Sequence, residues 1–130
     1  EEMPPTNGDY QIHLSQIDHH VYHDMPNQEH FHKSSSYVQK KIGDHVASLI
    51  EDGACLQTGF GGIADGGVKN LHNHQHLGVL PEMVSEGAVD LTKKVIVTNT
   101  KKAILPGKMG ASFGLGSNKR YKFMDNNPLI

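Results

Sequence analysis

The sequence has few of the residues that mark disulfide-stabilised or secreted proteins. Its 130 residues include one cysteine, Cys55, and no tryptophan. A single cysteine excludes a disulfide within the chain and fits a reducing compartment, so we expect a cytoplasmic protein. Because Cys55 lies in an apolar run, it is predicted to be a small core residue rather than a reactive thiol.

Long apolar runs and an excess of positive charge are also missing. No run approaches the roughly 20 apolar residues that span a bilayer. Residues 1–5, Glu-Glu-Met-Pro-Pro, lack the basic and apolar regions of a signal peptide. The formal net charge of −2 gives no electrostatic basis for binding nucleic acid or an anionic membrane surface. We therefore expect neither as a partner.

A strong helix signal follows a loop-rich N-terminal region. Residues 10–17 alternate between apolar and polar and predict a strand, and residues 23–36 read as an exposed, His-rich connection. Ser36 and Gln39 then have the spacing of a capping box, and Gly53 marks the stop of the helix. The apolar residues at helical spacing, which we expect in the core, include Val38, Ile42 and Leu49.

The remaining chain alternates between short strands and helices. The expected strands are 54–58, 77–80, 95–99 and 109–115. The expected helices are 63–71, weakened by two glycines, and 84–91. Residues 117–123, "SNKRYKF", are interpreted as leading to a turn, with binding of an anionic ligand tail as the sharper alternative. This alternation predicts an α/β fold with a largely parallel sheet.

Two elements fall beyond the carboxyl ends of strands, where such sheets bind ligands. The first is the glycine loop in "LQTGFGGIAD", residues 56–65, where Gly59, Gly61 and Ala64 also fit the dinucleotide pattern G-x-G-x-x-A. Its backbone N–H groups suit a phosphate or an oxyanion, although a plain turn is the simpler reading. The second is Glu82, which could be a surface residue, a ribose ligand or a nucleophile. The residues alone leave these alternatives open.

Ten histidines raise the question of a metal site. His72, His74 and His76 alternate, and neutral imidazoles bind zinc or nickel well. No cysteine or carboxylate completes a known ligand spacing around them. We therefore predict no native metal site.

The order of three motifs resembles a known family of enzymes. These motifs are "IGDHVASLIEDGACLQTGFGGIAD", "LGVLPEMVSEGAVDL" and "YKFMDNNP". Together they resemble the acetyl-CoA hydrolase/transferase family, and within it the 4-hydroxybutyrate and butyrate:acetate CoA-transferases. The resemblance implies an open α/β/α CoA-transferase-like fold that is only partly present. Residues 1–33 would then be an irregular or strand entry segment, and residues 34–130 the start of a C-terminal α/β domain.

The resemblance also implies a set of site residues. Glu82 in "PEMVSEG" matches the catalytic glutamate of the family. Asn126 looks like an active-site asparagine. The substrate pocket would lie near the glycine loop, at Gln57, Gly59, Gly61 and Gly62. Departures from the family pattern occur at Ala64, at 80–81 and at Glu86, and they put the choice of substrate in doubt.

The activity implied by the resemblance is transfer of CoA between an acyl-CoA and a short-chain carboxylate, in acetyl-CoA metabolism. The glutamate would pass through an anhydride and a CoA thioester, with acyl-CoA hydrolysis as a related outcome. Coenzyme A is then a substrate, and no permanently bound cofactor is expected. A homo-oligomer is left open, and an isolated segment of this kind can be inactive. The alternative from another class is a non-enzymatic nucleotide- or CoA-binding module, or a dinucleotide-binding α/β domain.

Overall fold

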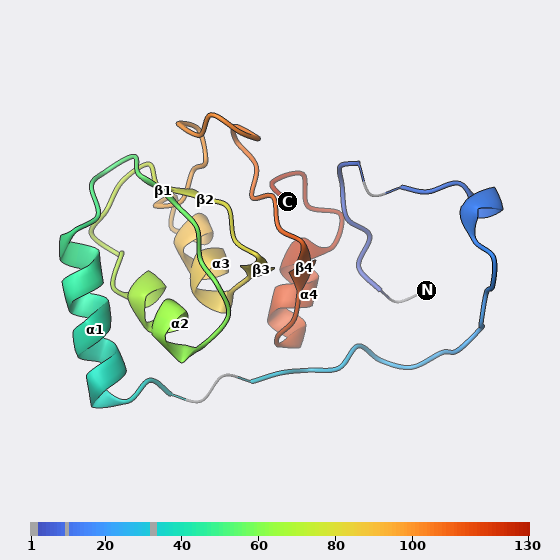
Figure 1. Ribbon diagram of the computed structural model, residues 1–130, viewed down its shortest axis with the longest axis horizontal. Coiled ribbons are helices and arrows are strands. Elements are labelled where there is room, and N and C mark those ends of the chain that lie inside the picture. Colours follow the sequence, from blue (N-terminus) through green and yellow to red (C-terminus); the bar gives the residue numbers. More distant parts are fainter. Residues whose placement is uncertain (1–2, 10, 32–33) are drawn as a thin grey trace.

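The computed structural model describes residues 3–9, 11–31 and 34–130 of the chain (Figure 1). The helices are η1 (Leu14–Gln16), α1 (Tyr37–Ser48), α2 (Gly62–Lys69), α3 (Glu86–Lys93) and α4 (Asn118–Met124). The strands are β1 (Cys55–Leu56), β2 (Gly78–Val79), β3 (Met83–Val84) and β4 (Phe113–Gly114). None of the helices in this described part is long and apolar enough to cross a bilayer.

The strands form two parallel pairs. β1 pairs with β2, with Cys55 opposite Gly78, and β3 pairs with β4, with Met83 opposite Phe113. The β1–β2 pairing continues past the short strands, because the backbone N–H of Leu80 donates to the carbonyl of Leu56 at 2.8 Å. The prediction of a largely parallel sheet is therefore confirmed.

Helix α1 begins as the sequence predicts and packs closely on α2. Ser36 and Gln39 form the reciprocal hydrogen bonds of a capping box. A Cβ at Gly43 would lie 2.9 Å from the carbonyl oxygen of Gly66, so the backbones of α1 and α2 approach closely at this point. The helix ends at Ser48 rather than continuing to Gly53.

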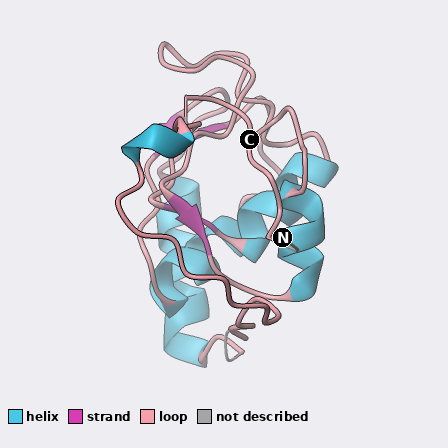
Figure 2. Ribbon diagram, turned by 90° about the vertical axis from the view of Figure 1, so that its right-hand side faces the viewer, coloured by secondary structure: helices cyan, strands magenta, loops and turns pink. Residues whose placement is uncertain are grey.

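The core lies between the strands and the helices, and Figure 2 shows most of the helices in the lower half of the view, with one strand among them and a short helix at the upper left. Helix α2 contacts α3, and α3 contacts α4. The side chains with the lowest exposure in this apolar cluster are Leu71, Leu77, Val79, Val84, Ala88, Val89, Val97 and Met109. The central chain segment, residues 77–84, therefore runs through the core.

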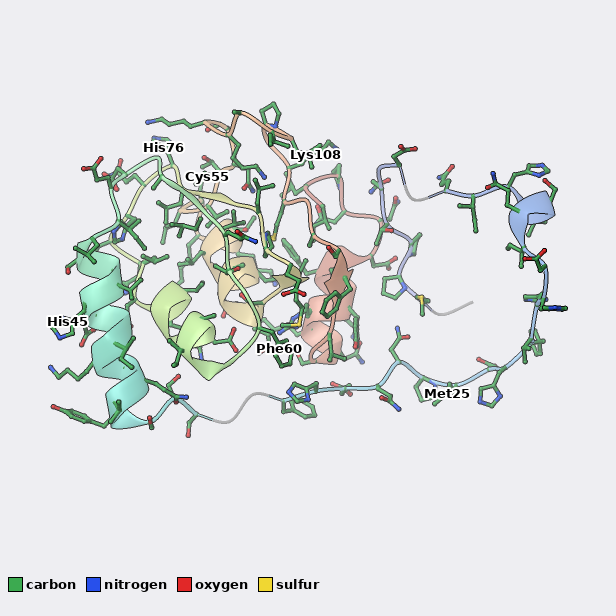
Figure 3. All side chains as sticks on the ribbon, in the orientation of Figure 1. Met25, His45, Cys55, Phe60, His76 and Lys108 are labelled. Carbon is green, nitrogen blue, oxygen red and sulfur yellow. The ribbon has the colours of Figure 1, made fainter. Side chains whose placement is uncertain are left out.

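Several residues predicted to be buried are exposed. Val38 on α1 is 64% exposed, and Leu49, directly after the end of α1, is 83% exposed, while Ile42 is half-buried. The small residues Gly43 and Ala47 take the buried face instead, because close packing on α2 requires them. Cys55 is exposed as well, so the prediction of a core cysteine is wrong (Figure 3).

Three predicted elements differ in the structure. Residue 10 lies outside the described residues, and residues 11–17 hold the short helix η1 rather than a strand. Residues 95–99 contribute a single bridge, between Val97 and Leu77. The last strand shrinks to β4, and the segment expected to form a turn is helix α4. A strand forms only where its backbone pairs with a neighbouring strand. An alternating apolar pattern in the sequence does not reveal whether such a neighbour is present.

Candidate functional site

Glu82 lies on the central chain segment, between the end of β2 and the start of β3. Its side chain is exposed. Its backbone N–H donates to the carbonyl of Thr58 at 3.2 Å, and its carbonyl accepts the N–H of Ser112 at 3.1 Å. The backbone of Glu82 is therefore fixed on both sides while its carboxylate reaches solvent.

The glycine loop begins directly after Thr58. Gly61 adopts a φ of 131°, which glycine tolerates and other residues rarely adopt. It is the N-cap of α2 and makes no side-chain cap hydrogen bond, so backbone N–H groups of the first helical turn point out of the helix end. The structure thus brings the glycine loop and Glu82 together, as the sequence predicted from their positions after neighbouring strands.

The residues around the loop differ in how freely a ligand could approach them. A Cβ at Gly59 or Gly61 would meet nothing within 4 Å, whereas one at Gly62 would lie 2.7 Å from the side-chain nitrogen of Gln39. Gln57 is exposed beside Thr58. Figure 3 shows Phe60 in the space between α2 and α4. Open space therefore adjoins Gly59 and Gly61 but not Gly62.

Thr58 carries an unusual polar group. Its hydroxyl is buried and has no hydrogen-bond partner among the described residues. The same residue accepts the N–H of Glu82 through its carbonyl. The sequence did not predict this contact with Glu82, because a threonine at the end of an expected strand is common.

Asn126 occupies a different place. It has a φ of 46°, and its backbone N–H donates to the carbonyl of Pro5 at 3.0 Å. It lines a hollow of about 750 Å³ after the end of α4, together with Lys93 and Phe123. Within the described residues, neither Glu82 nor the glycine loop lines this hollow. The structure does not bring Asn126 together with the other predicted site residues.

Helices α3 and α4 bring a half-buried carboxylate, Glu86, near a buried guanidinium, Arg120. Arg120 is fully buried, and its Nη1 atom lies 4.0 Å from the sulfur of Met83. Burial lowers the pKa of Arg120, and the charge of Glu86 opposes that shift. Glu86 in turn accepts a hydrogen bond from the hydroxyl of Ser117, which lowers the pKa of its carboxyl. The interpretation of residues 117–123 as a segment leading to a turn missed the burial of Arg120, because a charged residue is normally expected at the surface.

Two of the three alternating histidines, His74 and His76, have different surroundings. The Nε2 atom of His74 lies 3.0 Å from the carbonyl of Ile50, and His76 is exposed with a φ of 55°. Among the residues that the structure describes, no group of three or more His, Cys, Asp or Glu side chains could hold a metal ion.

The site thus offers three chemical features beyond the carboxyl ends of β1 and β2. It has an exposed carboxylate on a fixed backbone, open space at Gly59, and backbone N–H groups at the start of α2. A carboxylate can act as a nucleophile, and oriented N–H groups can stabilise negative charge that develops on a carbonyl oxygen.

Comparisons with known proteins point to one group of enzymes. The chain is 42% identical, over all its 130 residues, to a 4-hydroxybutyrate coenzyme A transferase of Clostridium kluyveri. It is 41% identical to a succinyl-CoA:acetate/propanoyl-CoA:succinate CoA transferase of Fasciola hepatica. No family model matches the chain. The predicted resemblance to CoA-transferases is confirmed over the whole chain.

A solved structure agrees with these relatives. The crystal structure of a 4-hydroxybutyrate CoA-transferase from Porphyromonas gingivalis superposes with a TM-score of 0.91 at 37% identity. That match covers 100% of this chain and 33% of the solved one. The Clostridium kluyveri and Fasciola hepatica relatives are covered over 30% and 27% of their lengths. The predicted CoA-transferase-like α/β fold is confirmed, and the chain spans about a third of the proteins that it matches.

Proposed function

We propose that this chain is the part of a CoA-transferase that carries its nucleophilic glutamate, Glu82. The complete protein would transfer CoA between an acyl-CoA and a short-chain carboxylate, with coenzyme A as a substrate. In this proposal, residues 34–130 begin the α/β domain that holds the glutamate, and residues 1–33 lead into it. The similarity to a relative named as a CoA-transferase extends over the whole chain, and its range therefore includes residues 81–87 around Glu82.

The observation that carries the proposal is the hydrogen bond from the N–H of Glu82 to the carbonyl of Thr58. It fixes the backbone of Glu82, whose side chain is exposed, beside the start of the glycine loop. Position matters in such chemistry, because a nucleophile held in line with its target gains a large effective concentration. A mobile surface glutamate would lack this advantage.

The reaction begins with attack of a Glu82 carboxylate oxygen on the thioester carbonyl carbon. A C–O bond forms, the C–S bond breaks, and CoA leaves as a thiolate. The product is a mixed anhydride between the acyl group and Glu82. The thiolate then attacks the carbonyl carbon of Glu82, and the donor carboxylate leaves. Glu82 now carries CoA as a thioester.

The acceptor carboxylate completes the cycle by the reverse steps. It attacks the Glu82 thioester, releases the thiolate and forms a second anhydride. The thiolate then attacks the new acyl carbonyl, which gives the product acyl-CoA and restores the Glu82 carboxylate. No net proton is taken up or released. Water attacking either intermediate would turn the enzyme into a hydrolase, so the complete site must exclude it.

The glycine loop supplies the second part of the proposal. Each attack places negative charge on a carbonyl oxygen, and backbone N–H groups near Gly61 and Gly62 would stabilise that charge. Gly59 would leave room for the acyl group, and the exposed Gln57 would contact substrate beside it. Asn126 is kept as a substrate-binding residue on the resemblance alone, because it lines a hollow after the end of α4 that neither Glu82 nor the glycine loop lines.

Trapping the intermediate in the complete gene product tests the proposal. The protein is incubated with acyl-CoA and then treated with hydroxylamine or borohydride, and its peptides are analysed by mass spectrometry. We expect the label on Glu82 and on no other carboxylate, with Glu86 as the internal comparison four residues away. A label elsewhere, or no label in a protein that transfers CoA, would overturn the mechanism.

The alternative binding module makes a different prediction for the same site. A module that only binds a nucleotide would take phosphate at the glycine loop and leave Glu82 unmodified. The relatives do not favour it. Equilibrium titration separates the two, because the proposed enzyme binds CoA esters and not NAD.

A further inference from the structure

The strand that leads to Glu82 is held differently on its two edges. On one edge, successive N–H groups of Gly78, Leu80 and Glu82 donate to carbonyls of the segment 54–58. On the other edge, a neighbouring strand is present only at the start, where Leu77 bridges Val97. The backbone of Val79 therefore lies beyond the end of that neighbour.

Two side chains take the place of the missing strand at Val79. The side-chain oxygen of Asn99 accepts the N–H of Val79 at 2.9 Å. The ammonium group of Lys102 donates to the carbonyl of Val79 at 2.8 Å. Both main-chain groups of Val79 are thus satisfied by side chains, three residues before Glu82.

The backbone conformation of Asn99 places its side chain at the N–H of Val79. Its φ of 58° lies in the left-handed region, which asparagine tolerates better than most residues. The turn ends the short strand, while the backbone N–H of Asn99 still donates to the carbonyl of Leu77 at 3.1 Å. Its own carbonyl accepts the N–H of Gly107 at 2.8 Å, which closes the loop that carries Lys102. Asn99 is 2% exposed, so its hydrogen bonds are shielded from water.

Lys102 is a buried cation that is held by carbonyl oxygens. It is 5% exposed, and its ammonium group also donates to the carbonyl of Lys108 at 2.6 Å. Burial lowers its pKa, and the side chain of Cys55 opposes that shift. Through the carbonyl of Val79, Lys102 therefore contacts the main chain of the strand that leads to Glu82.

We infer that Asn99 and Lys102 are positioning residues for Glu82. Together they fix Val79 at the unpaired edge of the strand that leads to Glu82. This inference rests on the proposed function of Glu82. A displacement of about 1 Å at a reacting group can cost about 100-fold in rate. Loss of either side chain would free one edge of the strand and let Glu82 move relative to the glycine loop.

Steady-state kinetics of the complete gene product test the inference with paired variants. Asn99→Leu keeps the size of the side chain and removes the acceptor, whereas Asn99→Asp keeps an acceptor oxygen. We expect Asn99→Leu to lower kcat by about 10- to 100-fold with little change in KM for acyl-CoA. Asn99→Asp should recover most of kcat. If Asn99 were only structural, both variants would have a lower melting temperature, and kcat would not fall selectively while KM stays nearly constant.

Lys102 provides a second arm that does not depend on Asn99→Leu folding. Lys102→Met removes both hydrogen bonds to carbonyls, and Lys102→Gln is a milder change that keeps a donor. The matched control is Lys101→Met, at an exposed neighbouring lysine. We expect kcat to fall most in Lys102→Met, less in Lys102→Gln, and not in Lys101→Met. Amide hydrogen exchange at Val79 and Leu80 should quicken in the same order.

The outcomes separate this inference from the proposed function. If the unmodified protein transfers no CoA, the proposed function fails. If it transfers CoA and folded Asn99→Leu or Lys102→Met keeps the original kcat while exchange at Val79 quickens, the positioning role is overturned.

Discussion

The backbone N–H of Glu82 donates to the carbonyl of Thr58 at 3.2 Å, and this bond joins the end of β2 to the start of the glycine loop. It continues a regular series in which Gly78 donates to Ala54 and Leu80 to Leu56. The two segments therefore stay parallel up to the point where Glu82 emerges into solvent. A shift of this pairing by one residue would turn the Glu82 side chain to the opposite face.

Replacement of the Glu82 carboxylate should abolish transfer without destabilising the fold. Glu82→Gln keeps the size and the backbone hydrogen bonds of the residue but removes the nucleophilic oxygen. Because the side chain is exposed, we expect a change in unfolding free energy within about 0.5 kcal/mol. Turnover of acyl-CoA should fall by several orders of magnitude, with CoA esters still bound. Thermal denaturation and initial rates, measured on the same preparation, check both parts.

The same measurements on Glu86→Gln serve as the comparison. That residue lies on α3 and accepts a hydrogen bond from Ser117, so its loss should affect stability more than turnover. A Glu82→Gln protein with normal turnover would exclude Glu82 as the nucleophile.

Substitutions in the glycine loop should divide into two kinds. Gly59 has open space where a Cβ would lie, so Gly59→Val should fold normally and obstruct the acyl group. Gly61 has a φ of 131°, so Gly61→Val should be strained and cost about 1–3 kcal/mol in stability. Unfolding in urea and transfer rates distinguish the two variants.

The transfer rate of Gly59→Val shows whether the acyl group lies next to Gly59. A folded Gly59→Val protein that transfers CoA at the original rate would place the acyl group away from Gly59. Gly59→Ala is the smaller control and should lower the rate less than valine does.

The sequence predicted those features that depend on local chemistry. The capping box at Ser36 and Gln39, the strand at 54–58 and the glycine loop all follow from residue types at short spacing. The nearness of the loop to Glu82 also followed, because parallel strands place their carboxyl ends at one edge.

Features that depend on distant partners could not be predicted in the same way. The periodicity on α1 identified an apolar face, yet the buried face is formed by Gly43 and Ala47, which pack on α2. The burial of Arg120 and the strand-like role of Asn99 depend on neighbours 37 and 20 residues away. No local pattern encodes such contacts.

The close approach of α1 and α2 gives a prediction about stability with a matched control. Gly43→Ala would place its Cβ 2.9 Å from the carbonyl oxygen of Gly66, where the backbone has little freedom to move. We expect a loss of about 1–3 kcal/mol in unfolding free energy. Gly67→Ala, in helix α2, would meet nothing within 4 Å and should gain about 0.5–1 kcal/mol from helix propensity. Equal effects in denaturant unfolding would contradict the close packing of these helices.

The hydrogen bond between Ser117 and Glu86 should make part of the stability depend on pH. Hydrogen bonding from Ser117 lowers the pKa of Glu86 below its usual value of 4.5, and the charges of Arg120 and Lys119 add to this shift, while desolvation opposes it. A carboxyl whose pKa is lower in the folded state stabilises the fold above the pKa of the unfolded state. That contribution is lost as the pH falls through the pKa of the folded state.

Ser117→Ala tests this dependence against the unmodified protein. At pH 7 we expect the variant to be less stable by about 1.5–3 kcal/mol, the range for a hydrogen bond to a charged group. The difference should stay constant down to about pH 5 and shrink below pH 4.5, where Glu86 becomes protonated in the unfolded chain. Asn118→Ala, at the next residue, is the control for changes at the start of α4 and should show no such convergence. A stability difference for Ser117→Ala that is the same at pH 7 and pH 3.5 would mean that the hydrogen bond does not depend on the charge of Glu86.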